Sequence, residues 1–163
     1  MLLAILLFPA ACKENSDDDV MNEAVVPDDT EISELLDAHN AYRKDVGIDD
    51  LLWSEDLQAS AQNWANLLAA NCEFKHSSDP YGENIWKGTS GAFTPTDVVK
   101  SWGSEIEFYD YGTNSCTDVC GHYTQIVWKN TTHVGCAKAS CDGTDVWVCQ
   151  YDPPGNFIGQ KPY

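Results

Sequence analysis

The stretch CGHYTQIVWKNTTHVGCAKASC, residues 120–141, decides the fold expected for this chain. It contains short runs that are rich in valine and aromatic residues, and the run DVWVCQY at 145–151 has the same character. The Asp142-Gly143 pair that separates these runs is a strong signal for a hairpin turn. We therefore predict an antiparallel β-meander in the last third of the chain, with His122 at the mouth of its first strand.

Three helices are predicted ahead of these strands. Apolar residues recur at helical spacing over 31–46. Ser54 is a capping residue for a second helix, which runs to about residue 71, and Thr94-Pro95 begins a third, which runs to about residue 108. The segment between the second and third helices, 75–93, is rich in glycine and serine and is expected to be a loop. Helices packed on a meander give an α+β sandwich.

Length and charge limit the class of protein. The chain has 163 residues, of which 43% are hydrophobic, so it has room for one domain with a packed core. Its net charge is -17, and ten acidic residues against one lysine fall within 12–37. From residue 38 onward, 16 acidic residues face eight basic ones. Because no basic stripe is present, nucleic acid is not an expected partner.

The cysteines and the N-terminal run indicate a place outside the cytoplasm. Seven cysteines in a short chain are typical of an oxidising compartment, and none of their spacings is that of a zinc finger. The uncharged apolar run at 1–11 is too short to span a bilayer and ends in small residues before Cys12. It resembles a bacterial lipoprotein signal in which Cys12 is lipidated. The alternative is an ordinary secretory signal that leaves a free thiol.

These features divide the chain into three parts. Residues 1–12 are expected to be a signal peptide that ends in a lipidated cysteine. Residues 13–30 are acidic, contain Pro27 and show no sustained periodicity, so we expect a disordered tether. Residues 31–163 are expected to form the folded domain.

Several ionisable residues stand out from their predicted elements. Glu105 lies three residues after Trp102 on the inward face of the third predicted helix, where a carboxylate is costly unless it is paired or solvated. His76 and Glu83 lie in the predicted loop, and Tyr81-Gly82 allows a sharp turn that could aim Glu83 inward. For each of these three residues the alternative is plain solvation.

The remaining histidines are open to simpler interpretations. His122 is either a functional residue or a structural histidine whose ring nitrogens are bonded locally. His39 lies on the apolar stripe of the first helix and is expected to be buried and structural, and His133 is expected in a solvated turn. Two imidazoles suit zinc or copper, and carboxylates can position water or accept its proton. No G-x-S-x-G elbow is present, and each cysteine after Cys12 has a plausible disulfide role.

Five segments and the C-terminal stretch together resemble the CAP superfamily, which comprises cysteine-rich secretory proteins, antigen 5 and pathogenesis-related 1 proteins. The segments are HNAYR at 39–43, LLWSEDLQASAQNWANLLA at 51–69, HSSDPYGENIW at 76–86, VVKSWGSEIEFYDY at 98–111, the stretch at 120–141, and VCQYDPPGNFIGQKPY at 148–163. They cover roughly residues 33–163 in unbroken order and are most similar to the plant pathogenesis-related 1 branch.

The resemblance implies a disulfide-stabilised, three-layer α-β-α sandwich around a central antiparallel meander. It also implies that His76, Glu83, Glu105 and His122 converge in one open cleft, where the two histidines can hold zinc or another divalent cation. The disulfides that it implies are Cys72–Cys141, Cys116–Cys120 and Cys136–Cys149, which leaves Cys12 unpaired.

Three functions remain open. The first is a non-enzymatic binding module, secreted or lipid-anchored to a membrane, whose cleft takes a divalent metal and whose surface takes a lipid, sterol or protein ligand. The second is a metal-dependent hydrolase in which Glu83 or Glu105 acts as general base. Two histidines are few for a catalytic zinc, which usually has three protein ligands, and this counts against the enzyme. The third is a structural envelope protein.

Overall fold

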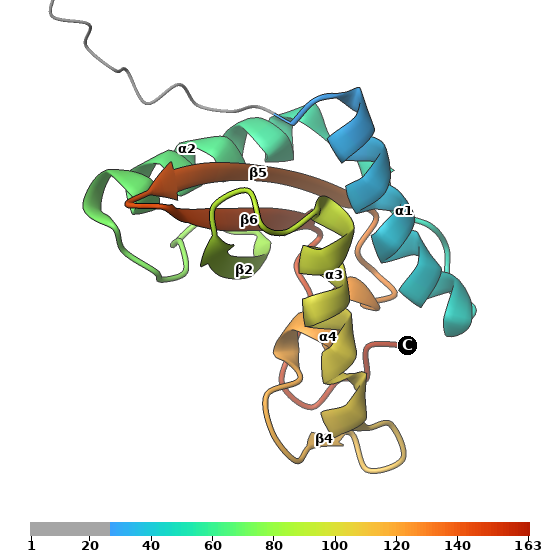
Figure 1. Cartoon of the computed structure of the whole chain (residues 1–163). Coiled ribbons are helices and arrows are strands. Elements are labelled where there is room, and N and C mark those ends of the chain that lie inside the picture. Colours follow the sequence, from blue (N-terminus) through green and yellow to red (C-terminus); the bar gives the residue numbers. More distant parts are fainter. Residues whose placement is uncertain (1–26) are drawn as a thin grey trace, which may run out of the picture.

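The computed structural model describes residues 27–163 of the chain (Figure 1). The expected signal peptide at 1–12, the lipidation site Cys12 and residues 13–26 of the expected tether at 13–30 lie outside the described residues. Helix α1 (Asp29–Asp45) begins two residues before the expected domain boundary at residue 31. It begins there because the Asp28 side chain accepts hydrogen bonds from the backbone N–H groups of Thr30 and Glu31.

Helix α2 (Glu55–Asn71) has the predicted bounds, and Ser54 caps it by accepting from the N–H of Leu57. Helix α3 (Pro95–Gly103) begins at the predicted Thr94-Pro95 pair, in a capping box with Asp97. It ends earlier than predicted, and the chain continues as the 3-10 helix η1 (Ser104–Phe108). Glu105 therefore projects from a separate turn and not from the face of α3.

The main sheet has four strands in the order β1 (Leu52–Trp53), β5 (His133–Cys141), β6 (Thr144–Asp152) and β2 (Gly82–Thr89). The predicted hairpin joins β5 to β6, with Asp142 and Gly143 at positive φ angles of 48° and 75°. Strand β2 runs antiparallel to β6, whereas β1 runs parallel to β5. The sheet is therefore mixed. The prediction of a purely antiparallel meander was wrong for β1, which pairs in parallel with β5.

Three local predictions were wrong. Residues 122–129 were expected to form a strand, but the short helix α4 (Gly121–Ile126) occupies most of this segment. Residues 123–126 are all buried there, including the polar Thr124 and Gln125, so no exposed face distinguishes a strand from a helix. The expected loop at 75–93 contains the edge strand β2. This strand was not predicted because the residues on both sides of it are polar and typical of loops. His133 is the first residue of β5 and not part of a turn.

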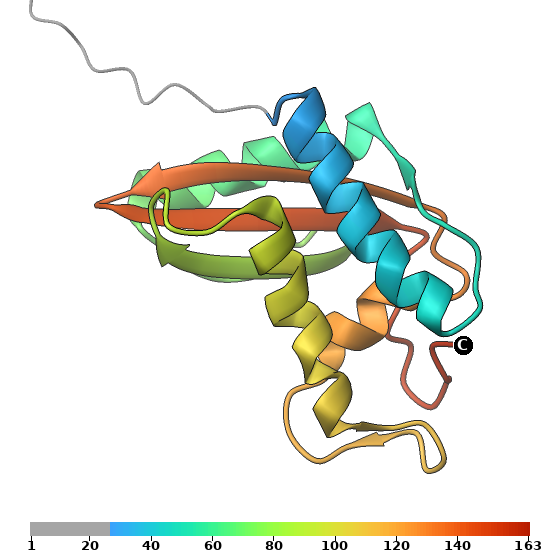
Figure 2. The same cartoon turned by 45° about the vertical axis from the view of Figure 1, so that its right-hand side comes forward.

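Helices cover both faces of the sheet, as the α-β-α architecture requires. Helix α2 packs on one face against apolar residues of β5 and β6, while α1, α3 and α4 pack on the other (Figures 1 and 2). A two-stranded sheet, β3 (Tyr109–Asp110) with β4 (Ser115–Cys116), lies beyond η1. Among residues 27–163, no helix combines the length and the apolar character needed to cross a bilayer.

Within residues 27–163 there are three disulfides: Cys72–Cys141, Cys116–Cys120 and Cys136–Cys149. These are the pairs that the family resemblance implies. Cys72 ends α2 and Cys141 ends β5, so the first disulfide ties a helix of one layer to the sheet. Cys136 and Cys149 are directly opposite each other on β5 and β6.

Candidate functional site

The first half of the site is a pair formed by His76 and Glu83. Strand β2 fixes the Glu83 backbone, and its Oε1 accepts from His76 Nδ1 at 2.7 Å and from the N–H of Ser77 at 3.0 Å. The Nε2 of Gln150, which lies opposite Glu83 on β6, approaches Oε2 at 3.4 Å. The Glu83 side chain is 6% exposed and that of His76 is 57% exposed. Glu83 therefore lies behind the histidine and orients its ring.

The two members of this pair shift each other's pKa in opposite directions. The hydrogen bond to Glu83 raises the pKa of His76, and partial burial opposes this effect. Burial raises the pKa of Glu83, but the hydrogen bonds from His76, Ser77 and Gln150 together outweigh it and hold that pKa below its ordinary value. The pair is therefore strongest at pH values between the two pKa values. It weakens as the pH rises through the His76 pKa or falls through the Glu83 pKa.

We expect His76 to titrate above its ordinary value of 6.5 in the metal-free protein. The reason is that loss of its proton removes the charge that faces Glu83. NMR titration of the imidazole signals measures the midpoint, and Glu83→Gln should bring it down toward that ordinary value. A midpoint that Glu83→Gln leaves unchanged would show that the carboxylate does not hold the ring.

The second half of the site is a pair formed by His122 and Glu105. Glu105 Oε1 accepts from His122 Nδ1 at 2.6 Å. Its Oε2 accepts from the backbone N–H groups of His122 and Tyr123 at 2.9 and 3.3 Å. The early end of α3 is what allows this contact, because η1 turns Glu105 toward the first residues of α4. The His122 ring stacks on Trp102, with 6.3 Å between the ring centroids.

One open hollow contains both histidines. Its volume is about 440 Å³, and its lining includes His76, Glu105, His122 and the aromatic residues Phe74, Trp86 and Trp102. Glu83 is not part of the lining, since His76 covers it. The structure thus brings three of the four expected residues to one hollow, with the fourth behind them, and edge strand β2 runs between the two pairs.

Both histidines have the same bonding pattern, and it fits a metal ligand. A carboxylate can only accept, so Nδ1 of each ring carries the proton, and the neutral ring keeps a lone pair on Nε2. No hydrogen bond within residues 27–163 involves Nε2 of either His76 or His122. A carboxylate that orients a histidine in this way is the usual support of a zinc-binding imidazole.

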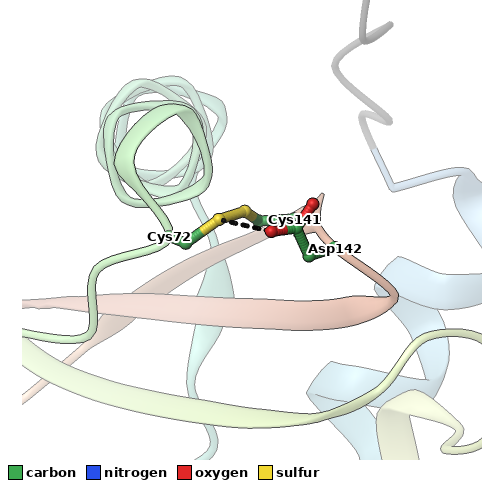
Figure 3. A group of neighbouring side chains, drawn as sticks. All are labelled: Cys72, Cys141 and Asp142. Carbon is green, nitrogen blue, oxygen red and sulfur yellow. Dashed lines mark hydrogen bonds between the residues drawn. A yellow bond between two sulfur atoms is a disulfide. The ribbon is translucent and has the colours of Figure 1, made fainter.

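The number of ligands is small, however. In the part of the chain that the structure describes, one group of three potential ligand atoms lies within 4.8 Å of one another, and it comprises Cys72, Cys141 and Asp142. Figure 3 shows that the two sulfur atoms of this group form a disulfide, beside which Asp142 lies. Thiolates are the sulfur ligands of zinc, so this group is not a metal site. A cation in the hollow would have two ligands from this chain, Nε2 of His76 and Nε2 of His122.

The other two histidines do not contribute to the hollow. His39 is buried and bonded at both ring nitrogens, to the Leu35 carbonyl and to the Tyr151 hydroxyl, which agrees with its structural interpretation. His133 Nδ1 contacts the Thr132 hydroxyl at the start of β5.

Sequence reasoning missed two buried amides beside the site, Asn84 and Gln150. Asn84 Nδ2 donates to the His122 carbonyl, and Gln150 supports Glu83. The available signal was a polar residue inside an otherwise apolar strand, as Gln150 is in DVWVCQY.

Comparison with known proteins identifies the family of this chain. The model of the cysteine-rich secretory protein family, CAP, matches residues 36–151. The chain belongs to the CAP family. It is 47% identical to pathogenesis-related protein 1A of Nicotiana tabacum over 133 residues, which cover 80% of this chain and 79% of that one.

Two further comparisons extend this result. Pathogenesis-related protein 1 of Arabidopsis thaliana is 45% identical over 131 residues, which cover 80% of this CAP chain and 81% of the relative. A crystal structure described as NaASP2 with Zn2+ superposes with a TM-score of 0.72 at 24% identity, over 85% of this chain and 87% of that one. The latter likeness shows the shared fold.

Proposed function

We propose that this CAP protein is a non-enzymatic binding module that acts outside the cytoplasm and holds a divalent cation, such as zinc, between His76 and His122. The observation that carries the proposal is the matched bonding of two histidines that line one hollow: Nδ1 of each ring is bonded to a glutamate, and Nε2 of each ring has no hydrogen-bond partner within residues 27–163. The bound cation would supply a positive charge that attracts an oxygen ligand. Three disulfides support a location in an oxidising compartment.

The glutamates favour binding over hydrolysis. A general base needs a free carboxylate oxygen within reach of the water that it activates. Both oxygens of Glu105 already accept hydrogen bonds from α4, and Glu83 is covered by His76. In the hydrolase alternative one of these contacts must break before the residue can act. The third alternative, a structural envelope protein, requires no metal at all.

Two hollows support a lipid, sterol or protein ligand. The walls of the metal hollow are aromatic, as described above. A second hollow of about 530 Å³ lies between α1 and α3. Its lining combines Ala38, Ala41 and Tyr42 with a charged rim, which comprises Glu34, Asp37, Asp45 and Lys100. Both volumes fall in the range of small-molecule sites, roughly 300–1,000 Å³. A pull-down with radiolabelled sterol and fatty acid tests this ligand class on the oxidised protein. If neither the sterol nor the fatty acid stays bound to the protein after washing, a protein ligand or the structural alternative is favoured.

His122→Ala is expected to weaken zinc binding by at least about 100-fold, or about 2.7 kcal/mol, because it removes one of two ligands. Isothermal titration calorimetry measures the affinity, and circular dichroism checks that the fold is retained. Glu105→Gln should weaken binding by roughly 10–100-fold through the lost orientation of the ring.

His133→Ala is the matched control, since this histidine lies at the start of β5 outside the hollow. It should leave zinc affinity unchanged. Equal losses in His122→Ala and His133→Ala would contradict the assigned site. Turnover of peptide or ester substrates that disappears in Glu83→Gln and Glu105→Gln would replace the binding proposal with the hydrolase.

A further inference from the structure

Edge strand β2 contacts both histidines through two consecutive residues. Glu83 accepts from the ring of His76, and the next residue, Asn84, donates from Nδ2 to the backbone carbonyl of His122 at 3.1 Å. Successive side chains of a strand point to opposite faces of the sheet. One strand therefore reaches His76 from one face and the His122 backbone from the other.

Asn84 is the first member of a buried hydrogen-bond chain. Its Nδ2 also lies 3.1 Å from the Tyr151 hydroxyl, which lies 2.8 Å from His39 Nε2. His39 Nδ1 completes the chain at 2.7 Å from the carbonyl of Leu35 on α1. Asn84, Tyr151 and His39 are each at most 1% exposed. Three buried side chains thus link α1, β6 and β2 to α4.

Each proton in this chain has one possible place. The Leu35 carbonyl can only accept, so His39 Nδ1 carries a proton, and burial lowers the pKa of His39 to about 4 and keeps the ring neutral. Its Nε2 must then accept from the Tyr151 hydroxyl, whose oxygen accepts from Asn84. The His122 carbonyl also can only accept, which fixes the Asn84 amide with its nitrogen toward α4. A chain with one consistent direction holds its members in one arrangement.

The helix that carries His122 needs such support. Helix α4 has six residues, and Cys120 gives its first turn no side-chain capping bond. A helix of this length is unstable without tertiary contacts. At its N-terminal end, Glu105 accepts from the backbone N–H groups of His122 and Tyr123, and Asn84 donates to the backbone carbonyl of His122.

We propose that Asn84, backed by Tyr151 and His39, is a positioning residue that fixes the His122 backbone relative to β2 and so sets where the His122–Glu105 pair lies with respect to His76. Its consequence for metal affinity rests on the proposed function, whereas the positioning itself does not.

The test compares Asn84→Ala and Tyr151→Phe with a matched control, Asn40→Ala. The control removes a partly buried amide that bonds the N–H and the carbonyl of Leu51 and touches neither histidine. Two measurements are made on the full-length, oxidised protein. NMR of the metal-free protein records the imidazole 15N and Nδ1–H signals of His122 and His76, and calorimetry records zinc affinity.

We expect both test variants to shift the His122 signals, to leave the His76 signals in place and to weaken zinc binding by about 10-fold. Asn40→Ala should lower stability and change neither set of signals. Unchanged His122 signals in both test variants, or an equal shift in Asn40→Ala, overturn the proposal. If Asn84→Ala fails to fold, Tyr151→Phe decides, because it removes only the hydroxyl. A wild-type protein that takes up no zinc defeats the metal site, and the NMR comparison still decides the positioning.

Discussion

Replacing Cys72 and Cys141 together with serine is expected to lower the free energy of unfolding by about 4 kcal/mol in the chain-entropy model. The two cysteines are 69 residues apart, so their disulfide closes a long loop and removes much of the freedom of the unfolded chain. Cys72 is also the C-cap residue of α2 and lies four residues before His76 in the sequence. Loss of the disulfide should therefore loosen the His76 half of the site more than the His122 half.

Urea unfolding under oxidising conditions measures the change, and the double replacement of Cys116 and Cys120 with serine is the comparison. That pair is four residues apart, and the same model gives it about 2 kcal/mol. NMR signals of His76 and His122 report the two halves of the site separately. Equal destabilisation by the two double variants would show that loop length does not control these disulfides.

The parts of the fold that the sequence predicted are those with local signals. Ser54 and Thr94 mark helix starts because their side chains bond the first free N–H groups, and Asp142-Gly143 marks a hairpin because both residues adopt positive φ. Strand β2 lacked such a signal, since its partner β6 lies about 60 residues further on. Helix α4 was missed because residues 123–126 are all buried, and the helical and strand periodicities cannot be told apart over so short a run.

The candidate site shows the same division. Glu105 and His122 could be singled out because a polar side chain is out of place at their positions in the predicted elements. His76 and Glu83 could be singled out because the turn at Tyr81-Gly82 allows a loop carboxylate to point inward. Gln150 and Asn84 could not be connected to them, because their roles depend on the register between β2 and β6 and on the position of α4. Local sequence patterns carry neither piece of information. The resemblance to CAP proteins supplied the convergence of the four residues, which periodicity alone did not.

Arg43 is the residue for which we expect the largest loss of stability from a single substitution. It is 1% exposed, and its guanidinium donates to four backbone carbonyls. The acceptors are those of Asp49 at 2.7 Å and of Ile126, Trp128 and Thr131 at 2.9 Å. Burial lowers the pKa of Arg43 to about 10, which leaves it charged at neutral pH. One side chain of α1 thereby fixes the end of α4 and the segment that leads into β5.

Arg43→Ala is expected to lower the free energy of unfolding by about 3–5 kcal/mol, because it leaves buried carbonyls without donors and a cavity in the core. Arg43→Lys should recover only part of this, since a single ammonium cannot reach four acceptors that match a planar fork. Urea unfolding measures both variants. The control is Lys44→Ala, which changes the neighbouring exposed residue. Its free energy of unfolding should stay within about 0.5 kcal/mol of wild type. Full stability of Arg43→Lys would mean that charge alone, and not the four directed bonds, holds α4 against α1. In that case the support of His122 would depend on Asn84 and Glu105 at the other end of the helix.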